Sequence, residues 1–255
     1  AAESEESANE AIRLIKVDYE LLRPFLTPSE SLEVCAPDEQ IHPHAKNGTN
    51  IHKMAQLHFG EPEKELESAH AKISVHCKFA GVTHAFTEPH ATIAIWNANG
   101  TLTVISATQV PHYLHRALSS VLKLPLHLIH VKKPFLGGGF GGKSDPFPHE
   151  IIAAYLAMKT HRPVKCVFSR EEVFLNNHGR HPTELDLSVG CDKDGKITAI
   201  DADIVIDGGA YGSFGVVTTY YNGVLLQGPY RVNNFGFRTR RVYTNKPQCG
   251  AMRGH

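Results

Sequence analysis

The chain has 255 residues, enough for one large or two modest domains with a buried core. Its 26 Lys and Arg residues equal its 26 Asp and Glu residues, so no net field attracts nucleic acid or an anionic membrane surface. The 5 cysteines are scattered without a C-x-x-C pair, which argues against a zinc knuckle or an iron–sulfur site in this chain and favours a reducing, cytoplasmic setting. No apolar run reaches a membrane-spanning length.

The first part of the chain predicts one short helix and then mainly strands. Residues 8–14 have helical periodicity, whereas residues 38–67 are polar and rich in turn signals, so we interpret them as a long surface excursion. Alternating apolar residues predict strands at 15–19 and 72–79 and a hairpin of 91–96 with 102–105.

The second part mixes helices and strands without a strict βαβ rhythm. Pro111 and Pro148 each stand where a helix begins, followed by apolar residues at helical spacing. The predicted strands are 128–131, 164–168, 185–189, 197–206 and 235–243, the last three with antiparallel character. This succession predicts an α+β fold.

The most unusual stretch is Gly137–Lys143, which reads Gly-Gly-Gly-Phe-Gly-Gly-Lys. Five glycines around one aromatic residue do not form a stable helix or strand, but they allow backbone N–H groups to approach a ligand closely. The stretch fits neither the dinucleotide-binding fingerprint in its βαβ context nor a P-loop. The alternative is a tight turn, but a turn needs only one or two glycines. We therefore predict a ligand-binding loop.

Three other places carry possible chemistry. Gln109 ends a predicted strand with a neutral donor and acceptor, although taken alone it could equally face solvent. Arg253 lies between glycines near the C-terminus and offers a rigid donor fork, or is simply an exposed arginine in a turn. The glycine-rich stretch Asp207–Gly215 is more typical of a structural bend than of a segment that forms the wall of a site.

Histidine pairs do not predict a metal site. His112 and His115 lie one helical turn apart, and His127 and His130 flank a short strand. Neither pair has a carboxylate or cysteine nearby at ligand spacing, so we interpret both pairs as structural.

Four motifs occur in an ordered series: Ser106-Ala-Thr-Gln109, Gly137–Lys143, Asp207-Gly-Gly-Ala-Tyr211 and Ala251-Met-Arg-Gly254. This series resembles the large, molybdopterin-binding subunit of the xanthine oxidase family of molybdenum hydroxylases. Glu88-Pro-His90 resembles a further segment of that family. The resemblance implies that residues 1–30 are the tail of a preceding hammerhead-type domain with a linker. Residues 31–255 would be the first part of the molybdopterin-binding domain, so that the chain is a fragment.

The resemblance implies roles for the residues of these motifs. Gln109 would hydrogen-bond the apical oxo group of molybdenum, and the pterin dithiolene would hold the metal without a protein ligand. Phe140 would lie beside the metal and shape the substrate slot. The remaining cofactor contacts would come from Gly138, Gly139, Gly141, Met252, Arg253 and Gly254.

Within the family, the chain is most similar to the 4-hydroxybenzoyl-CoA reductase branch. Ser144 stands where purine oxidases carry a substrate-binding glutamate, and Tyr221 stands at about the position of their second substrate anchor, an arginine. A neutral pocket of Phe140, Ser144, Tyr221 and His255 would suit a phenol ring. The implied reaction is reductive removal of the para hydroxyl from an aromatic CoA thioester. A glutamate expected near the metal would lie beyond His255, so this fragment alone should be inactive.

The resemblance further implies cofactors and partners. The pterin would be the cytosine dinucleotide, with FAD and iron–sulfur clusters on partner subunits, ferredoxin as electron donor and a dimer of heterotrimers as the assembly. Two alternatives stay open. One is an oxidative molybdenum hydroxylase acting on an aromatic aldehyde or heterocycle, and the other is a non-catalytic scaffold with the same fold.

Overall fold

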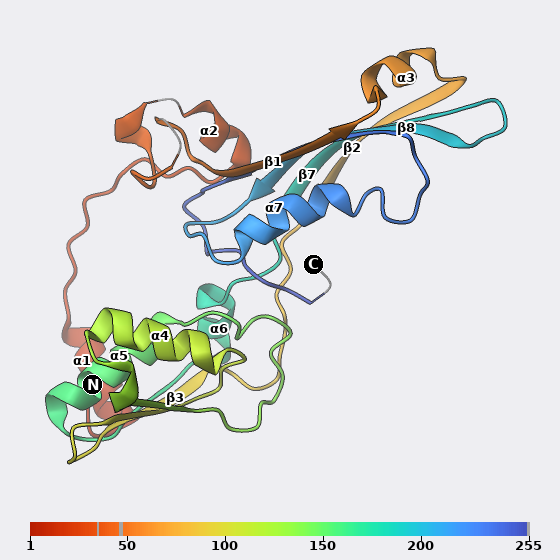
Figure 1. The fold of residues 1–255 in the computed structure, drawn as a ribbon. Coiled ribbons are helices and arrows are strands. Elements are labelled where there is room, and N and C mark those ends of the chain that lie inside the picture. Colours follow the sequence, from red (N-terminus) through yellow and green to blue (C-terminus); the bar gives the residue numbers. More distant parts are fainter. Residues whose placement is uncertain (35, 46–47, 254–255) are drawn as a thin grey trace. The chain divides into compact units, whose positions relative to one another are not determined.

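The protein is described by a computed structural model that covers residues 1–34, 36–45 and 48–253 (Figure 1). The chain forms two compact units. Unit 1 comprises Ala1–Arg23, Phe86–Gly139 and Lys143–Val173, and unit 2 comprises Pro24–Ala85, Phe140–Gly142 and Phe174–His255. Each unit combines a mixed sheet with helices, which confirms the predicted α+β class. The proposed boundary near residue 30 stays a prediction.

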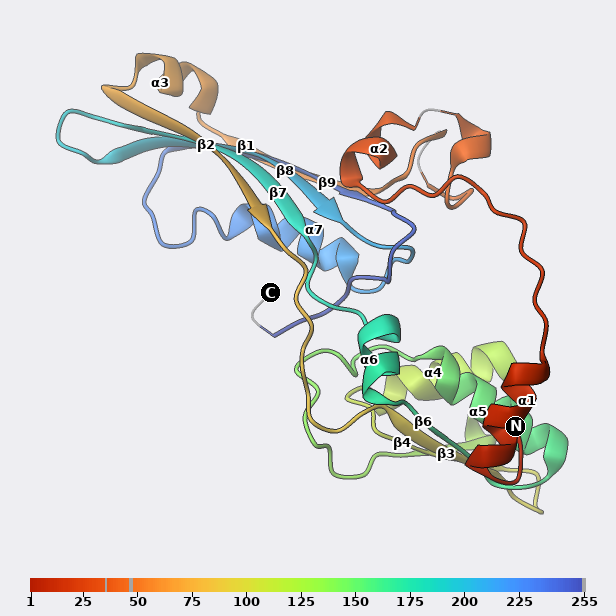
Figure 2. The ribbon, with the colours of Figure 1, turned by 180° about the vertical axis from the view of Figure 1, so that it is seen from behind.

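Unit 1 is built on a four-stranded sheet whose strands, in spatial order, are β5 (Ile129–Lys132), β4 (Leu102–Ser106), β3 (Ala91–Trp96) and β6 (Val164–Val167). The hairpin of β3 and β4 is antiparallel as predicted, and β5 runs parallel to β4. Helices α4 (Pro111–Leu122) and α5 (Pro148–Thr160) begin at the two predicted prolines and pack on this sheet (Figure 2). Leu114 and Leu118 of α4 and Ala154 of α5 are fully buried there, and this apolar layer is the core of unit 1.

The other elements of unit 1 lie outside this core. The predicted N-terminal helix is α1 (Glu5–Leu14), and a short 3-10 turn, Leu126–Leu128, precedes β5. Residues 15–19 form no strand, so that prediction is wrong. Their alternating pattern lacks a partner strand, and an isolated strand cannot satisfy its backbone hydrogen bonds.

Unit 2 is built on a five-stranded sheet whose strands, in spatial order, are β1 (Ile51–Phe59), β9 (Asn234–Val242), β8 (Ile197–Asp207), β7 (Thr183–Cys191) and β2 (Ala71–Phe79). Helix α7 (Gly215–Val224) packs on one face and α3 (Pro62–Ser68) on the other (Figure 1). Neighbouring residues of β9 show the two faces, because Phe237 lies against Gly223 of α7 and Gly236 against Pro62 of α3. Three shorter elements complete the description: α2 (Pro28–Glu33), the 3-10 turn Pro37–Glu39 and α6 (Arg170–Asn176), which spans the boundary between the units.

Two predictions for unit 2 are wrong. The supposed surface excursion at 38–67 contains β1 and α3. The sequence pattern does not reveal β1 because this is an edge strand whose exposed positions include Met54, Gln56 and His58. Its partner β9 is also far away in the sequence. The last strands are also not all antiparallel, since β8 and β9 are parallel. A parallel pair needs a crossover, and α7 provides it.

Candidate functional site

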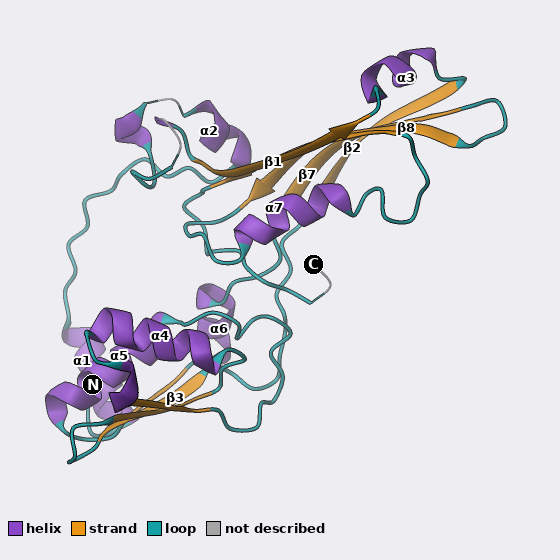
Figure 3. Cartoon of the chain, in the orientation of Figure 1, coloured by secondary structure: helices purple, strands orange, loops and turns teal. Residues whose placement is uncertain are grey.

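The glycine stretch is divided between the two units. Gly137–Gly139 and Lys143 belong to unit 1, and Phe140–Gly142 belong to unit 2. Figure 3 shows the segment that leads to α5 as loop, as the glycine content requires. The predicted site residues are therefore found in two groups, one in each unit.

In unit 1 the side chain of Gln109 lies on the backbone of the glycine stretch. The N–H of Gln109 donates to the carbonyl of Lys143 at 2.8 Å, and its side-chain Oε1 accepts the N–H of Lys143 at 3.1 Å. A Cβ on Gly139 would overlap this amide, coming within 2.7 Å of its Cδ. The missing side chain at Gly139 is thus what allows the Gln109 amide to lie there, and the structure brings these two predicted residues together.

Lys143 is a second feature of unit 1, and sequence reasoning gave it no role. Its side chain is 0% exposed, pairs with Glu88 Oε2 at 2.6 Å and lies 4.8 Å from the centroid of the Phe86 ring. Glu88 also accepts the N–H of Gly137 at 2.9 Å. Burial alone would raise the pKa of Glu88, but the hydrogen bonds from Lys143 and Gly137 outweigh it and hold that pKa below its usual value. The pair fixes both ends of the unit 1 part of the stretch.

In unit 2 the glycine stretch lies against the segment around Arg253. Phe140 has a left-handed backbone with φ 52°, and its carbonyl accepts the N–H of Arg253 at 3.0 Å. A Cβ on Gly141 would come within 2.6 Å of the carbonyl oxygen of Ala251. His178 Nε2 lies 2.9 Å from the carbonyl oxygen of Gly141. The structure therefore brings Phe140, Gly141 and Arg253 together.

Hydrogen bonds to the backbone hold residues 250, 251 and 253. The N–H of Gly250 donates to the carbonyl of Gly179 at 3.0 Å, and His84 Nε2 lies 2.7 Å from the carbonyl oxygen of Ala251. Arg180 donates from Nη2 to the carbonyl of Arg253 at 2.9 Å. These three contacts leave the exposed Arg253 side chain and the Met252 side chain as the groups this segment presents.

A cavity of about 340 Å³ in unit 2 adjoins this segment. Met252 and Gly250 line it, together with Tyr221 of α7 and with Arg180 and His181. Leu185, Ile204 and Leu225 add apolar wall. The predicted pocket residue Tyr221 and the predicted cofactor residue Met252 thus face one space. Ser144 belongs to unit 1, and Gly254 and His255 lie outside the described residues.

Comparison with known proteins decides the family. The molybdopterin cofactor-binding domain model matches residues 41–255. The chain belongs to this family. The nicotinate dehydrogenase large molybdopterin subunit of Eubacterium barkeri is 34% identical over 100% of the chain and 58% of its own length. The putative xanthine dehydrogenase molybdenum-binding subunit XdhA of Escherichia coli K12 is 32% identical over 100% of the chain and 33% of its own length.

A solved structure agrees with this assignment. Quinoline 2-oxidoreductase from Pseudomonas putida 86 superposes with a TM-score of 0.88 and 26% identity, over 99% of the chain and 32% of that chain. The domain is therefore of the xanthine oxidase type, as its motifs predict, and it spans between about a third and 58% of the relatives named here. In the described part of the chain, no helix is long and apolar enough to cross a membrane.

The residues of this molybdopterin-binding domain fit the cofactor that the family name implies. A Cβ at Gly139 would overlap the Gln109 amide and one at Gly141 would overlap the Ala251 carbonyl, so these glycines bring the predicted cofactor-binding groups close to the glycine stretch. Gln109 presents a neutral amide that changes no charge at the site. The fit rests on the backbone around Gly139 and the Gln109 amide in unit 1, and on the backbone around Gly141 in unit 2.

Sequence reasoning missed the residues that hold these groups. Glu88 and Lys143 were visible only as parts of motifs, because a buried ion pair between residues 55 positions apart leaves no local pattern. His84 and His178 hold the backbone of Ala251 and Gly141, and a histidine in a loop gives no such signal by itself. A lysine directly after a run of glycines, as at Gly142-Lys143, is the local signal that could have pointed to this pair.

Proposed function

We propose that the chain is the molybdenum-cofactor-binding part of an oxidoreductase that reduces 4-hydroxybenzoyl-CoA to benzoyl-CoA. The observation that carries this proposal is the cavity shared by Tyr221 and Met252, whose described walls contain no carboxylate side chain. The size and apolar walls of this cavity suit one aromatic ring, and Ser144 stands at the position where a glutamate would anchor a purine. The Tyr221 hydroxyl can hydrogen-bond a phenol oxygen.

The bound cofactor would supply the two-electron oxidation–reduction chemistry. Removal of the hydroxyl takes two electrons and two protons and releases water, so the reaction needs a reductant, which we propose is reduced ferredoxin. Gln109 would donate a neutral hydrogen bond toward the metal centre. Phe140, Ser144 and Tyr221 would orient the ring, and Gly138, Gly139, Gly141, Met252, Arg253 and Gly254 would bind the cofactor.

The same proposal covers the assembly. We expect the pterin to be the cytosine dinucleotide and the electrons to pass through iron–sulfur and FAD subunits in a cytoplasmic dimer of heterotrimers. Two relatives are a large molybdopterin subunit and a molybdenum-binding subunit, which supports the presence of further subunits. Subunit composition and nucleotide analysis of the native complex test these points.

One observation favours a second function, oxidative hydroxylation of an aromatic heterocycle. Two of the proteins compared above are named for nicotinate and quinoline. Arg180 lines the same cavity as Tyr221, and its guanidinium could pair with the carboxylate of an aromatic acid. Nicotinate and nicotinamide differ only in this carboxylate and therefore form a matched pair of test compounds.

The deciding experiment is an anaerobic assay of the native complex with 4-hydroxybenzoyl-CoA and a reduced low-potential donor. Benzoyl-CoA formation is the expected result, with purines and benzaldehyde as inactive controls. If the complex instead oxidises nicotinate, rejects nicotinamide and leaves the thioester unchanged, the heterocycle function replaces the reductase function.

The role of Gln109 has its own test in the variant Gln109→Glu. The carboxylate keeps an acceptor for the N–H of Lys143 but removes the amide donor and adds a charge. We expect the molybdenum resonance in electron paramagnetic spectra to change and turnover to fall about 100-fold. Gln56→Glu, on the exposed side of β1, is the matched control. Wild-type spectra and turnover in Gln109→Glu would remove this residue from the site.

A further inference from the structure

The glycine-rich stretch Asp207–Gly215 has no role in the site described so far. It bends around Arg241 of β9, whose side chain is fully buried. Nη2 of Arg241 donates to the carbonyl oxygens of Gly208 at 2.9 Å, Tyr211 at 3.1 Å and Cys249 at 3.3 Å. One guanidinium therefore joins the beginning and the middle of this bend to Cys249, the first residue of the Cys249–Arg253 segment.

The glycines of the bend make room for this guanidinium. A Cβ on Gly208 would come within 2.6 Å of Nη1 of Arg241, and one on Gly215 would overlap the guanidinium and lie 2.7 Å from Cδ. Gly209, at φ 65°, is pressed against Pro247 and Gln248, with the Cα of Gln248 2.7 Å from a Cβ at this position. Glycine is thus required at these positions to leave space for the Arg241 guanidinium and the neighbouring backbone, and not only to let the chain bend.

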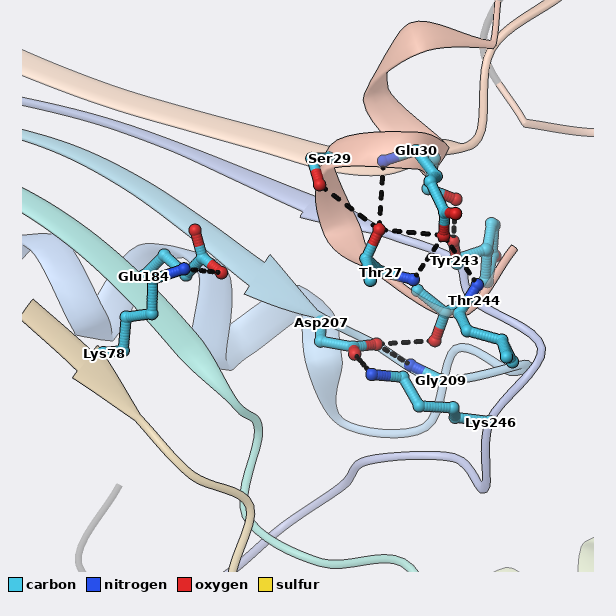
Figure 4. A network of polar contacts seen from close by, with 12 residues as sticks. Thr27, Ser29, Glu30, Lys78, Glu184, Asp207, Gly209, Tyr243, Thr244 and Lys246 are labelled. Atoms are coloured by element: carbon cyan, nitrogen blue, oxygen red, sulfur yellow. Dashed lines mark hydrogen bonds and ion pairs between the residues drawn. The ribbon is translucent and has the colours of Figure 1, made fainter.

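The partners of Arg241 are carbonyls and imidazoles. Nε donates to Nε2 of His181 at 3.2 Å, and Nη1 lies 2.6 Å from Nδ1 of His52. The carboxylate of Asp207 is engaged elsewhere, because it accepts from Gly209 N at 3.0 Å and Thr244 Oγ1 at 2.6 Å and pairs with Lys246 (Figure 4). Burial lowers the pKa of Arg241 to about 10, so the guanidinium stays charged at neutral pH.

Cys249 is fixed from both sides by this network. Its N–H donates to the carbonyl of Gly208 at 3.0 Å, and its own carbonyl accepts from Arg241. The next residues, Gly250–Arg253, carry the groups proposed to contact the cofactor, and Arg253 N–H holds Phe140. Displacement of the guanidinium would remove the hydrogen bond to the Cys249 carbonyl and so loosen the start of this segment.

We infer that Arg241 is a positioning residue for cofactor binding, which holds the Cys249–Arg253 segment in place by tying it to the Asp207–Gly215 bend. The inference rests on the proposed cofactor role of Met252 and Arg253. It gives the bend a function: the glycines form a socket for one buried guanidinium.

The test compares Arg241→Met with Arg238→Met in the native complex. Arg238 lies on the same strand, but its side chain is 56% exposed and pairs with Asp203. Hydrogen exchange measured by mass spectrometry should speed up about tenfold or more for the amides of 208–215 and 249–253 in Arg241→Met. Molybdenum and pterin content per chain should fall at least about threefold. Arg238→Met should match the wild type in both measurements.

Two further variants guard against general misfolding. Arg241→Lys keeps the charge but not the donor fork, so it should resemble Arg241→Met if positioning is the role and the wild type if only the charge matters. Gly215→Ala leaves Arg241 intact and favours the α7 helix by intrinsic propensity, yet its Cβ would displace the guanidinium. It should therefore speed exchange at 249–253 while β2 and β7 stay protected.

The possible outcomes distinguish a failure of the positioning role of Arg241 from a failure of the proposed function. Wild-type exchange at 249–253 in Arg241→Met or Gly215→Ala, or full protection in Arg241→Lys, overturns the positioning role whatever the cofactor content. Faster exchange with unchanged molybdenum and pterin overturns it too, because the segment would then not serve cofactor binding. A wild-type complex that holds no molybdenum and pterin would remove the proposed function, and the exchange data would still show whether Arg241 orders the segment.

Discussion

Two fully buried cations, one in each unit, are stabilised in different ways. In unit 1, Lys143 faces the carboxylate of Glu88 at 2.6 Å and the face of Phe86. In unit 2, Arg241 is held by three backbone carbonyls and the nitrogens of His52 and His181. The first arrangement neutralises the charge, whereas the second disperses it over neutral dipoles.

The difference shows what each cation does. A point charge beside a carboxylate gives a strong but simple link, here between Glu88 and the end of the glycine stretch. A guanidinium has five donors in a fixed fork and can tie several backbone segments together at once. The second arrangement also depends on both histidines staying neutral, because a protonated imidazole has no acceptor to offer.

The largest effect is expected when the unit 1 pair is broken. Lys143→Met leaves the partly buried Glu88 carboxylate without its cation and should lower the free energy of unfolding of unit 1 by about 3 kcal/mol. Fluorescence of Trp96, the single tryptophan and a residue of β3, reports denaturation of this unit. A loss below about 1 kcal/mol would mean that the Phe86 face and the loop, rather than the pair, stabilise this region.

A smaller effect is expected in unit 2 from His181→Leu. The substitution leaves Nε of the buried Arg241 without its imidazole acceptor and should cost about 2 kcal/mol. Hydrogen exchange of the β9 amides is the measurement. His76→Leu on β2, where the histidine is exposed, is the control. Equal exchange in the two variants would contradict the proposed dependence of Arg241 on the His181 acceptor.

Acid should affect the two units differently. Burial, followed by the charge of Arg241, lowers the pKa of His52 to about 4, and burial also lowers the pKa of His84. The unfolded chain then binds more protons than the folded one between about pH 6.5 and 4, so unit 2 loses stability as the pH falls through this window. His52→Asn keeps an acceptor for Arg241 and should flatten the slope, which denaturation at several pH values checks.

Unit 1 contains two neighbouring groups with opposite behaviour. Burial lowers the pKa of His149 to about 4 and raises the pKa of Glu150 to about 7, despite hydrogen bonds from Ser106 and the N–H of Phe147. His149 makes the folded state more stable as the pH rises from about 4 to 6.5. Glu150 makes the folded state less stable as the pH rises from about 4.5 to 7. The free energy of unfolding of unit 1, followed by Trp96 fluorescence, should therefore change little with pH in the wild type. In Glu150→Gln it should rise with pH, because only the contribution of His149 remains.

The smallest effect is expected from an exposed pair in unit 2. Lys78 and Glu184 lie on neighbouring strands with side chains 66% and 40% exposed (Figure 4). Lys78→Ala should change the free energy of unfolding by less than about 0.5 kcal/mol in denaturant titrations. A larger loss would mean that the exposed face of this sheet depends on its ion pairs, which would weaken the contrast with buried Lys143.

The sequence predicted those parts of the fold that depend on local patterns. The hairpin of β3 and β4 and the helices that begin at Pro111 and Pro148 follow from alternation, turn residues and helix starts. Helix α7 was missed because Thr, Tyr, Asn and Gly in its sequence are weak helix formers, and its packing on β9 outweighs their propensity. Strand β1 was missed for lack of a nearby partner.

For the site, too, the residues that stand in local motifs could be predicted, whereas those that depend on distant contacts could not. Gln109, Phe140 and Arg253 stand in recognisable motifs, and the structure places Gln109 on Lys143 and Arg253 on Phe140, but their roles toward the cofactor stay predictions. The roles carried over to Ser144, Tyr221 and His255 stay predictions. Arg241 could not be found, because its donors meet residues 8 to 189 positions away and the only trace in the sequence is the glycine socket.

The nesting of the two units along the chain has a consequence for biosynthesis. All strands and the two core helices of unit 1 lie between residues 91 and 167, so this core can assemble as soon as that stretch leaves the ribosome. Among the described strands, β1 by contrast pairs with β9 alone, and β9 follows all the others in the sequence. During translation β1 therefore stays an unpaired edge until the residues up to β9 (Asn234–Val242) have been made, and this strand is where we expect a chaperone to be needed.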